Sequence, residues 1–170
     1  LSSLYWIPFS LSYDENFKSF IPIAIIIIPA FLSLFYALAF ILFKICINKN
    51  KIFLNILIFS LSLSFFEFLR GNILSGFPWN LFAYSFSENI YLIQINSLIG
   101  VYAFNMIVIL VFSVPSIIFL NRNRQNLSVF ILILIIFISL HVFGFFKIKN
   151  FNNTEDQILS NKIKIISTNI

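Results

Sequence analysis

The sequence predicts an all-α polytopic membrane helix bundle, with four full spans preceded by the end of an earlier one. Of its 170 residues, 60% are hydrophobic and only 10% are charged, and the mean hydropathy is +0.99. A soluble domain has about 25% charged and 45–50% apolar residues. The apolar residues also gather in runs of about 20, the length that a helix needs to cross roughly 30 Å of hydrocarbon. These observations exclude a water-soluble domain and a disordered chain, and a single cysteine excludes a disulfide scaffold.

Each expected span has its own polar features. The spans cover residues 21–47, 52–69, 91–120 and 127–146. The first holds Lys44 near its end, where a long side chain reaches the headgroups, and the second holds Glu67 near its far end. The third has no charge and is long enough to tilt or kink, and it holds Gln94, Asn96, Asn105 and Pro115. His141 is the only ionisable group of the fourth. Runs that are apolar on every face indicate helices packed within a membrane.

Charge in the connections predicts the orientation. The loop between the first two spans carries Lys49 and Lys51, and the loop between the last two carries Arg122 and Arg124. Neither loop holds an acidic residue, so we expect both to be cytoplasmic. All six acidic residues fall on the other side. The net charge of +5 is therefore explained by topology, and no nucleic-acid partner is expected.

The two ends of the chain indicate a piece of a longer protein. It begins with Leu rather than Met, and residues 1–11 are typical of the tail of an earlier helix, with Tyr5 and Trp6 at the interface and Pro8 breaking it. Residues 1–146 form the predicted bundle, and residues 147–161 are polar and predict a linker. Residues 162–170 alternate apolar and charged side chains as in a half-buried strand. We expect a soluble domain to start there, on the non-cytoplasmic side.

The densest cluster of unusual residues follows the second span. Glu67 and Arg70 are spaced i, i+3 and share a helix face, so they can pair at the membrane edge. Gly71 and Gly76 then bracket a turn, and the sequence Gly76-Phe77-Pro78-Trp79-Asn80 interrupts regular helix. Non-helical backbone at membrane depth is tolerated only where protein or a water-filled cavity satisfies it. We therefore expect this loop to fold back against the bundle and line a cleft.

A simpler interpretation covers the same residues. Glu67 and Arg70 would form an interfacial ion pair, Trp79 would belong to the aromatic belt, and the glycines and Pro78 would only make a turn.

The ordered series Glu67-Phe-Leu-Arg-Gly, then Gly76-Phe-Pro-Trp-Asn, resembles the signature of the apolipoprotein N-acyltransferases. Further similarities lie at Tyr5-Trp6-Ile7, Tyr84, Gln94 and Gly100-Val101-Tyr102, and residues 163–170 resemble the first strand of the nitrilase-like domain of that family. Four positions depart from the family pattern: Ala83, Ala103, Asn105 and Ser167. Asn105 stands where a small hydroxyl residue is frequent.

The resemblance implies a multi-pass enzyme of the bacterial inner membrane with its C-terminal tail in the periplasm. Such enzymes move an acyl chain from a phospholipid of the phosphatidylethanolamine type to the N-terminal diacylglyceryl-cysteine of a lipoprotein. The resemblance implies ping-pong chemistry through a Cys thioester, with a Glu as general base and acid and a Lys at the oxyanion. All three belong to the α/β nitrilase-like domain, so this fragment is expected to be inactive, with no catalytic residue of its own. It is expected to be a monomer without cofactor that positions lipids.

The substrate-positioning residues expected from this resemblance are Glu67, Arg70, Gly76, Phe77, Pro78 and Trp79. Arg70 would either pair with Glu67 or meet a phosphate. Cys46 lies at the end of an apolar span and is expected to pack as a small hydrophobe rather than act as a nucleophile. His141 has no second ligand at metal-binding spacing, so no metal site is expected. Gln94, Asn96 and Asn105 are expected to hydrogen-bond between helices.

Two other functions remain open from the residues. A broken segment with charges can also form the midplane site of a transporter or permease. A scaffold subunit without activity is the third possibility. A charged pair at the edge of a span and a strand after the fourth span argue against transport.

Overall fold

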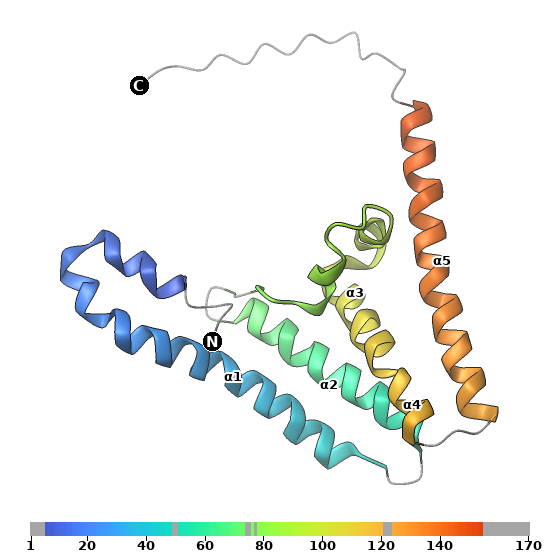
Figure 1. Cartoon of the computed structure of the whole chain (residues 1–170), viewed down its shortest axis with the longest axis horizontal. Helices are drawn as coiled ribbons and strands as arrows, with labels where there is room; N and C mark the ends of the chain where they lie inside the picture. The colour runs from blue at the N-terminus through green and yellow to red at the C-terminus, as the bar shows by residue number, and fades with distance from the viewer. Residues whose placement is uncertain (1–5, 49–50, 74–75, 77, 121–123, 155–170) are drawn as a thin grey trace.

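A computed structural model describes residues 6–48, 51–73, 76, 78–120 and 124–154 (Figure 1). The predicted site residue Phe77, the predicted strand at 162–170 and Tyr5 lie outside the described residues.

Every regular element in the described part of the chain is a helix. The α-helices are α1 (Ile21–Cys46), α2 (Ile52–Asn72), α3 (Asn96–Ser113), α4 (Pro115–Leu120) and α5 (Arg124–Thr154). Short 3₁₀ helices are η1 (Ile7–Tyr13), η2 (Glu15–Phe20), η3 (Phe82–Phe86) and η4 (Leu92–Ile95). Four segments are long and apolar enough to cross a membrane: Glu15–Cys46, Ile52–Asn72, Leu92–Phe119 and Asn126–Phe151. The predicted class, an all-α membrane bundle with four spans, is confirmed.

Three boundaries differ from the sequence prediction. Helix α2 continues to Asn72, so Gly71 lies in its last turn rather than in the loop. The third span is interrupted at Gly100, which adopts φ 77° and ψ 164° inside α3, whereas Val114 between α3 and α4 keeps helical values, φ −60° and ψ −36°. Helix α5 continues to Thr154, through half of the segment assigned to a linker. Pro8 lies in the first turn of η1, which proline fits, and the earlier helix expected before it falls outside the described residues.

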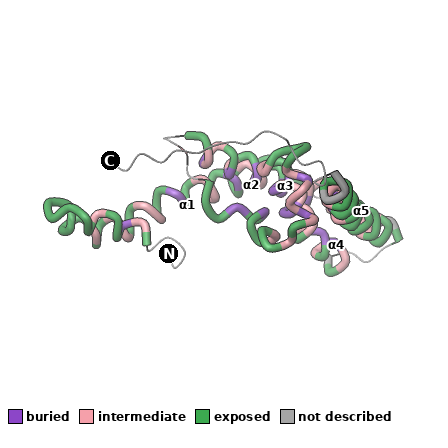
Figure 2. Tube along the Cα trace, turned by 90° about the horizontal axis from the view of Figure 1, so that it is seen from above, coloured by how far each residue is buried: buried purple, intermediate pink, exposed green. Residues whose placement is uncertain are grey.

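Helix α2 lies at the centre of the described bundle, between α1 and α3 (Figure 1). One core cluster joins Ala39, Leu63 and Ile109 from these three helices. Buried residues gather where α2 meets α3 and in the loop between them, whereas much of α1 and α5 is exposed (Figure 2). In a membrane protein, outward apolar side chains of this kind face lipid.

Helix α5 packs against the rest of the bundle at two heights. Near its start, Ile133 joins Ile56, Val114 and Ile117 in a core cluster. Further along, Gly144 lies against the backbone of Tyr91, so close that a Cβ there would be 1.8 Å from the Tyr91 carbonyl oxygen. These contacts hold the segment around η4 against the later half of α5, as Figure 1 shows.

Candidate functional site

The loop after α2 turns back on itself through two left-handed residues. Gly76 has φ 79°, and a Cβ there would lie 2.5 Å from the carbonyl oxygen of Gly71. Asn80 has φ 62°, a conformation that asparagine tolerates better than most residues. Pro78 and Trp79 lie between them, and the bond from Arg70 to the Trp79 carbonyl holds the loop back against the bundle; the cleft that it was expected to line stays a prediction.

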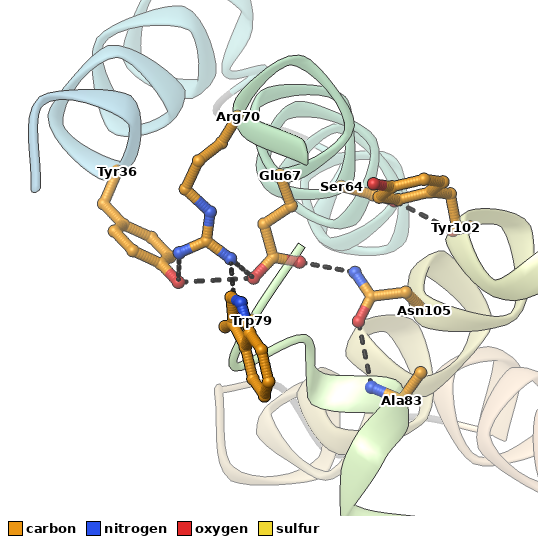
Figure 3. A network of polar contacts seen from close by, with 8 residues as sticks. All are labelled: Tyr36, Ser64, Glu67, Arg70, Trp79, Ala83, Tyr102 and Asn105. Carbon is orange, nitrogen blue, oxygen red and sulfur yellow. Dashed lines mark hydrogen bonds and ion pairs between the residues drawn. The ribbon is translucent and has the colours of Figure 1, made fainter. Parts of the chain in front are cut away.

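A buried polar network receives the returning loop (Figure 3). The Arg70 Nη1 donates to the Tyr36 hydroxyl at 2.9 Å, and its Nη2 donates to the Trp79 carbonyl at 2.8 Å. The Tyr36 hydroxyl donates to Oε1 of Glu67 at 3.4 Å. Arg70 and Glu67 are 4% and 2% exposed, so the loop is attached to charged groups that are removed from solvent.

The ion pair within this network is coulombic and bridged rather than bidentate. Nη2 of Arg70 lies 3.9 Å from Oε1 of Glu67, beyond hydrogen-bond range. Tyr36 bridges the two, and the Arg70 Cζ also lies 5.2 Å from the centroid of its ring, within cation–π distance. Both terminal nitrogens of Arg70 therefore have protein partners, whereas its buried Nε has no hydrogen-bond partner among the described residues.

Asn105 ties the other side of Glu67 to the loop. Its Nδ2 donates to Oε2 of Glu67, and its Oδ1 accepts a hydrogen bond from the Ala83 N–H at 2.9 Å. A carboxylate only accepts and a backbone N–H only donates, so this amide orientation follows from its partners. Asn105 is 0% exposed. Its expected role in bonding between helices is confirmed, whereas Gln94 bonds the nearby carbonyl of Ile90.

The network joins the later part of α2 to the middle of α1. Glu67 is about 22 Å along α2 from Ile52, at 1.5 Å per residue. Tyr36 lies about 15 Å before the end of α1, in the middle of that helix. The expected position of the pair at the membrane edge stays a prediction.

The Trp79 indole is the outward part of the loop. Its carbonyl is held by Arg70, while the side chain is 53% exposed and extends away from the charged groups (Figure 3). Trp6, which precedes η1, meets it edge-on, with ring centroids 5.6 Å apart and an interplanar angle of 73°. The two rings thus form an exposed aromatic pair beside a buried charge network.

The structure brings Glu67, Arg70 and Trp79 together, with Gly76 and Pro78 shaping the loop. Of the two alternatives for Arg70, pairing with Glu67 is the arrangement observed. Sequence reasoning missed Tyr36 as a member of the network. A tyrosine in the middle of an apolar span, away from both interfaces, was the available signal.

Two residues set aside earlier can now be placed. Cys46 is exposed at the end of α1, so its predicted packing role is wrong: the side chain leaves the bundle instead of filling it. His141 meets the Tyr91 ring edge-on at 5.1 Å between centroids. In the described ranges, no three His, Cys, Asp or Glu side chains gather as metal ligands.

Comparison with known proteins identifies relatives of the chain. The family described as "Apolipoprotein N-acyltransferase N-terminal domain" matches residues 1–114. A protein of Rhodopseudomonas palustris named apolipoprotein N-acyltransferase is 34% identical over 149 residues, which is 86% of this chain and 27% of the relative. Proteins of the same name from Bradyrhizobium diazoefficiens and Rickettsia bellii are 39% and 38% identical, over 56% and 64% of this chain and 17% and 21% of their own length.

The chain spans about a quarter of the length of the curated relatives it matches. No solved structure matches it. The family match extends from η1 through the Trp79 loop to the end of α3, and so includes the whole network. The chain therefore belongs to the apolipoprotein N-acyltransferase family.

Proposed function

We propose that this chain is the membrane part of an apolipoprotein N-acyltransferase and that it positions lipid substrates for acyl transfer. The donor is a phospholipid of the phosphatidylethanolamine type, and the acceptor is the N-terminal diacylglyceryl-cysteine of a lipoprotein. The bond-forming chemistry belongs to a nitrilase-like domain in the periplasm, through a Cys thioester with Glu and Lys. The enzyme acts as a monomer in the bacterial inner membrane.

The observation that supports this role is the exposed aromatic pair on a fixed backbone. Trp79 presents half of its surface outward while its carbonyl is anchored by Arg70. An acyl chain lying against Trp79 and Trp6 gains apolar contact with two rings that already pack together, on a Trp79 backbone that Arg70 already holds. Holding two lipids in reach of a reactive group supplies proximity, which is a large part of what a membrane domain can contribute to acyl transfer.

Within this proposal, Glu67 and Arg70 are positioning residues, and the contact with lipid falls to the loop. Arg70 is 4% exposed and already engages Tyr36, Glu67 and Trp79. A phosphate would have to displace those partners to reach it. We therefore assign lipid contact to Trp79, Pro78 and Phe77, and support of the backbone to Gly76 and the charged pair.

The test is acyl-transfer kinetics of the full-length enzyme carrying Trp79→Ala or Trp79→Phe. If the indole contacts a lipid, Trp79→Ala raises the KM for phospholipid about tenfold, the effect of losing roughly 1.4 kcal/mol of contact. Trp79→Phe retains an aromatic surface and restores most of the activity.

Tyr13→Ala is the matched control, since Tyr13 is an aromatic residue on η1 that is 94% exposed. It should leave the kinetics unchanged. Wild-type kinetics of Trp79→Ala in a well-inserted protein, or equal losses in Tyr13→Ala, would exclude a positioning role for the loop.

A further inference from the structure

The two rings of the exposed aromatic pair come from separate parts of the chain. Trp6 immediately precedes η1, and its carbonyl accepts a hydrogen bond from the Phe9 N–H at 3.1 Å. Pro8 in η1 is buried, and η1 packs against α1 (Figure 1). Trp79, in contrast, belongs to the loop after α2. The geometry of the pair therefore depends on how α1 is placed relative to that loop.

Tyr36 is the polar connection between α1 and the loop. Its hydroxyl accepts from Nη1 of Arg70 at 2.9 Å, and Nη2 of the same guanidinium donates to the Trp79 carbonyl at 2.8 Å (Figure 3). In the part of the chain that the structure describes, no other side chain of α1 forms a hydrogen bond with another element. The Ser33 hydroxyl, for example, donates to the Ala30 carbonyl of its own helix.

The remaining contacts of α1 with the bundle are apolar. Ala39 packs with Leu63 of α2 and Ile109 of α3 in one core cluster. Apolar contact is non-directional, whereas a hydrogen bond from a charged guanidinium requires a defined distance and angle. The Tyr36 hydroxyl therefore adds a directional constraint that the apolar contacts of α1 do not supply.

We infer that Tyr36 is a positioning residue that sets where the Trp79 ring meets Trp6. The contacts form a closed circuit, from α1 through η1 to Trp6, across the ring contact to Trp79, and back through Arg70 to Tyr36. Removal of the hydroxyl opens this circuit at Nη1 of Arg70, so the two rings can separate while the helices remain folded. The effect on lipid positioning rests on the proposed function, whereas the effect on the ring contact does not.

The test is Tyr36→Phe in the full-length enzyme, which keeps the ring over Arg70 and removes only the hydroxyl. Loss of one hydrogen bond lowers the fraction of molecules with the rings in contact by up to about fivefold, and the KM for phospholipid rises by the same factor. We expect kcat to stay within about twofold, whereas a merely structural defect would lower kcat and leave KM unchanged. In a Trp6→Ala background, Tyr36→Phe should raise KM no further, because no ring pair remains to be aligned.

A second measurement follows the ring contact without using activity. Fluorine NMR of the full-length protein labelled with fluorotryptophan gives a Trp79 resonance, which is assigned by its loss in Trp79→Phe. Trp6→Ala removes the neighbouring ring and moves this resonance, and we expect Tyr36→Phe to move it in the same direction. Tyr91→Phe is the matched control, since Tyr91 is also half-buried but its ring meets His141 rather than the network. It should change neither the resonance nor KM.

The outcomes separate this inference from the proposed function. An unmoved Trp79 resonance in Tyr36→Phe, or equal effects of Tyr36→Phe and Tyr91→Phe, would overturn the positioning role. A raised KM in Trp79→Ala together with a wild-type KM in Tyr36→Phe would overturn it as well, and would leave the proposed function standing. A moved resonance with a wild-type KM in both variants would support the control of the ring contact by Tyr36 and would exclude the lipid role of the loop instead.

Discussion

Replacing Glu67 with glutamine tests whether the buried network holds the loop. The substitution keeps the size of the side chain but removes the charge that faces Arg70 at 3.9 Å. The new Nε2 donor faces the Nδ2 donor of Asn105. If the Asn105 amide turns over to restore that bond, the Ala83 N–H loses its acceptor. Either outcome leaves a buried polar group without a partner.

The magnitude follows from these contacts. An ion pair at about 4 Å is worth about 4 kcal/mol at an effective dielectric constant of 20, and an unsatisfied donor costs a further 1–3 kcal/mol. The carbonyl of the introduced glutamine still accepts from Tyr36 and still faces Arg70, so part of the lost interaction energy is kept. We therefore expect Glu67→Gln to lower the free energy of unfolding by about 3 kcal/mol. Removing one partner of a buried ion pair costs about 3–5 kcal/mol in general, so this value is at the lower end of that range.

The assay is unfolding of the purified protein by SDS titration, with Asn105→Asp as the second arm of a double-mutant cycle. Alone, Asn105→Asp puts two carboxylates side by side and destabilises the protein. In the double variant with Glu67→Gln, the donor and the acceptor exchange places. The introduced glutamine donates to the introduced aspartate, and the aspartate also accepts from the Ala83 N–H. We expect a favourable coupling of about 2 kcal/mol. Additive losses, or a wild-type stability of Glu67→Gln, would refute the proposed bonding pattern.

Three glycines give further predictions, all read from SDS unfolding midpoints. Gly71→Ala places a Cβ 1.9 Å from the Tyr102 hydroxyl oxygen, so we expect a loss of about 2 kcal/mol that Tyr102→Phe partly restores; no loss would mean that α2 and α3 are further apart. Gly144→Ala would put a Cβ 1.8 Å from the Tyr91 backbone oxygen, which cannot turn aside, so α5 must separate from η4. Gly100→Ala meets nothing within 4 Å, so we expect only the cost of its backbone conformation, about 1–3 kcal/mol, because φ 77° with ψ 164° is essentially restricted to glycine; an equal cost for Gly144→Ala and Gly100→Ala would contradict the close contact of α5.

The spans and the turn were predictable because they depend on local sequence. Long apolar runs define membrane helices whatever surrounds them. The i, i+3 spacing of Glu67 and Arg70 likewise allows the observed pair, and the glycines with Pro78 require the chain to turn.

The partners of the pair could not be read from the sequence. Tyr36 and Asn105 reach Glu67 from positions that are 31 and 38 residues away along the chain. Which face each helix turns toward α2 depends on packing, and α1 and α3 are apolar nearly all round. The extension of α5 to Thr154 was missed because polar composition was taken to indicate a linker. No glycine or proline follows Gly144, so nothing local stops the helix there.

The network explains why an apolar bundle contains two buried charges. A loop that folds back against an apolar bundle carries backbone groups that cost several kcal/mol each if they are left unbonded. Arg70 satisfies the Trp79 carbonyl, and Asn105 satisfies the Ala83 N–H. The buried Arg70 in turn needs a counter-charge, and Glu67 provides it while also fixing the amide of Asn105. The aromatic loop and the charged pair are thus a single structural requirement, because the Trp79 ring is presented outward from a backbone that is bonded from within the bundle.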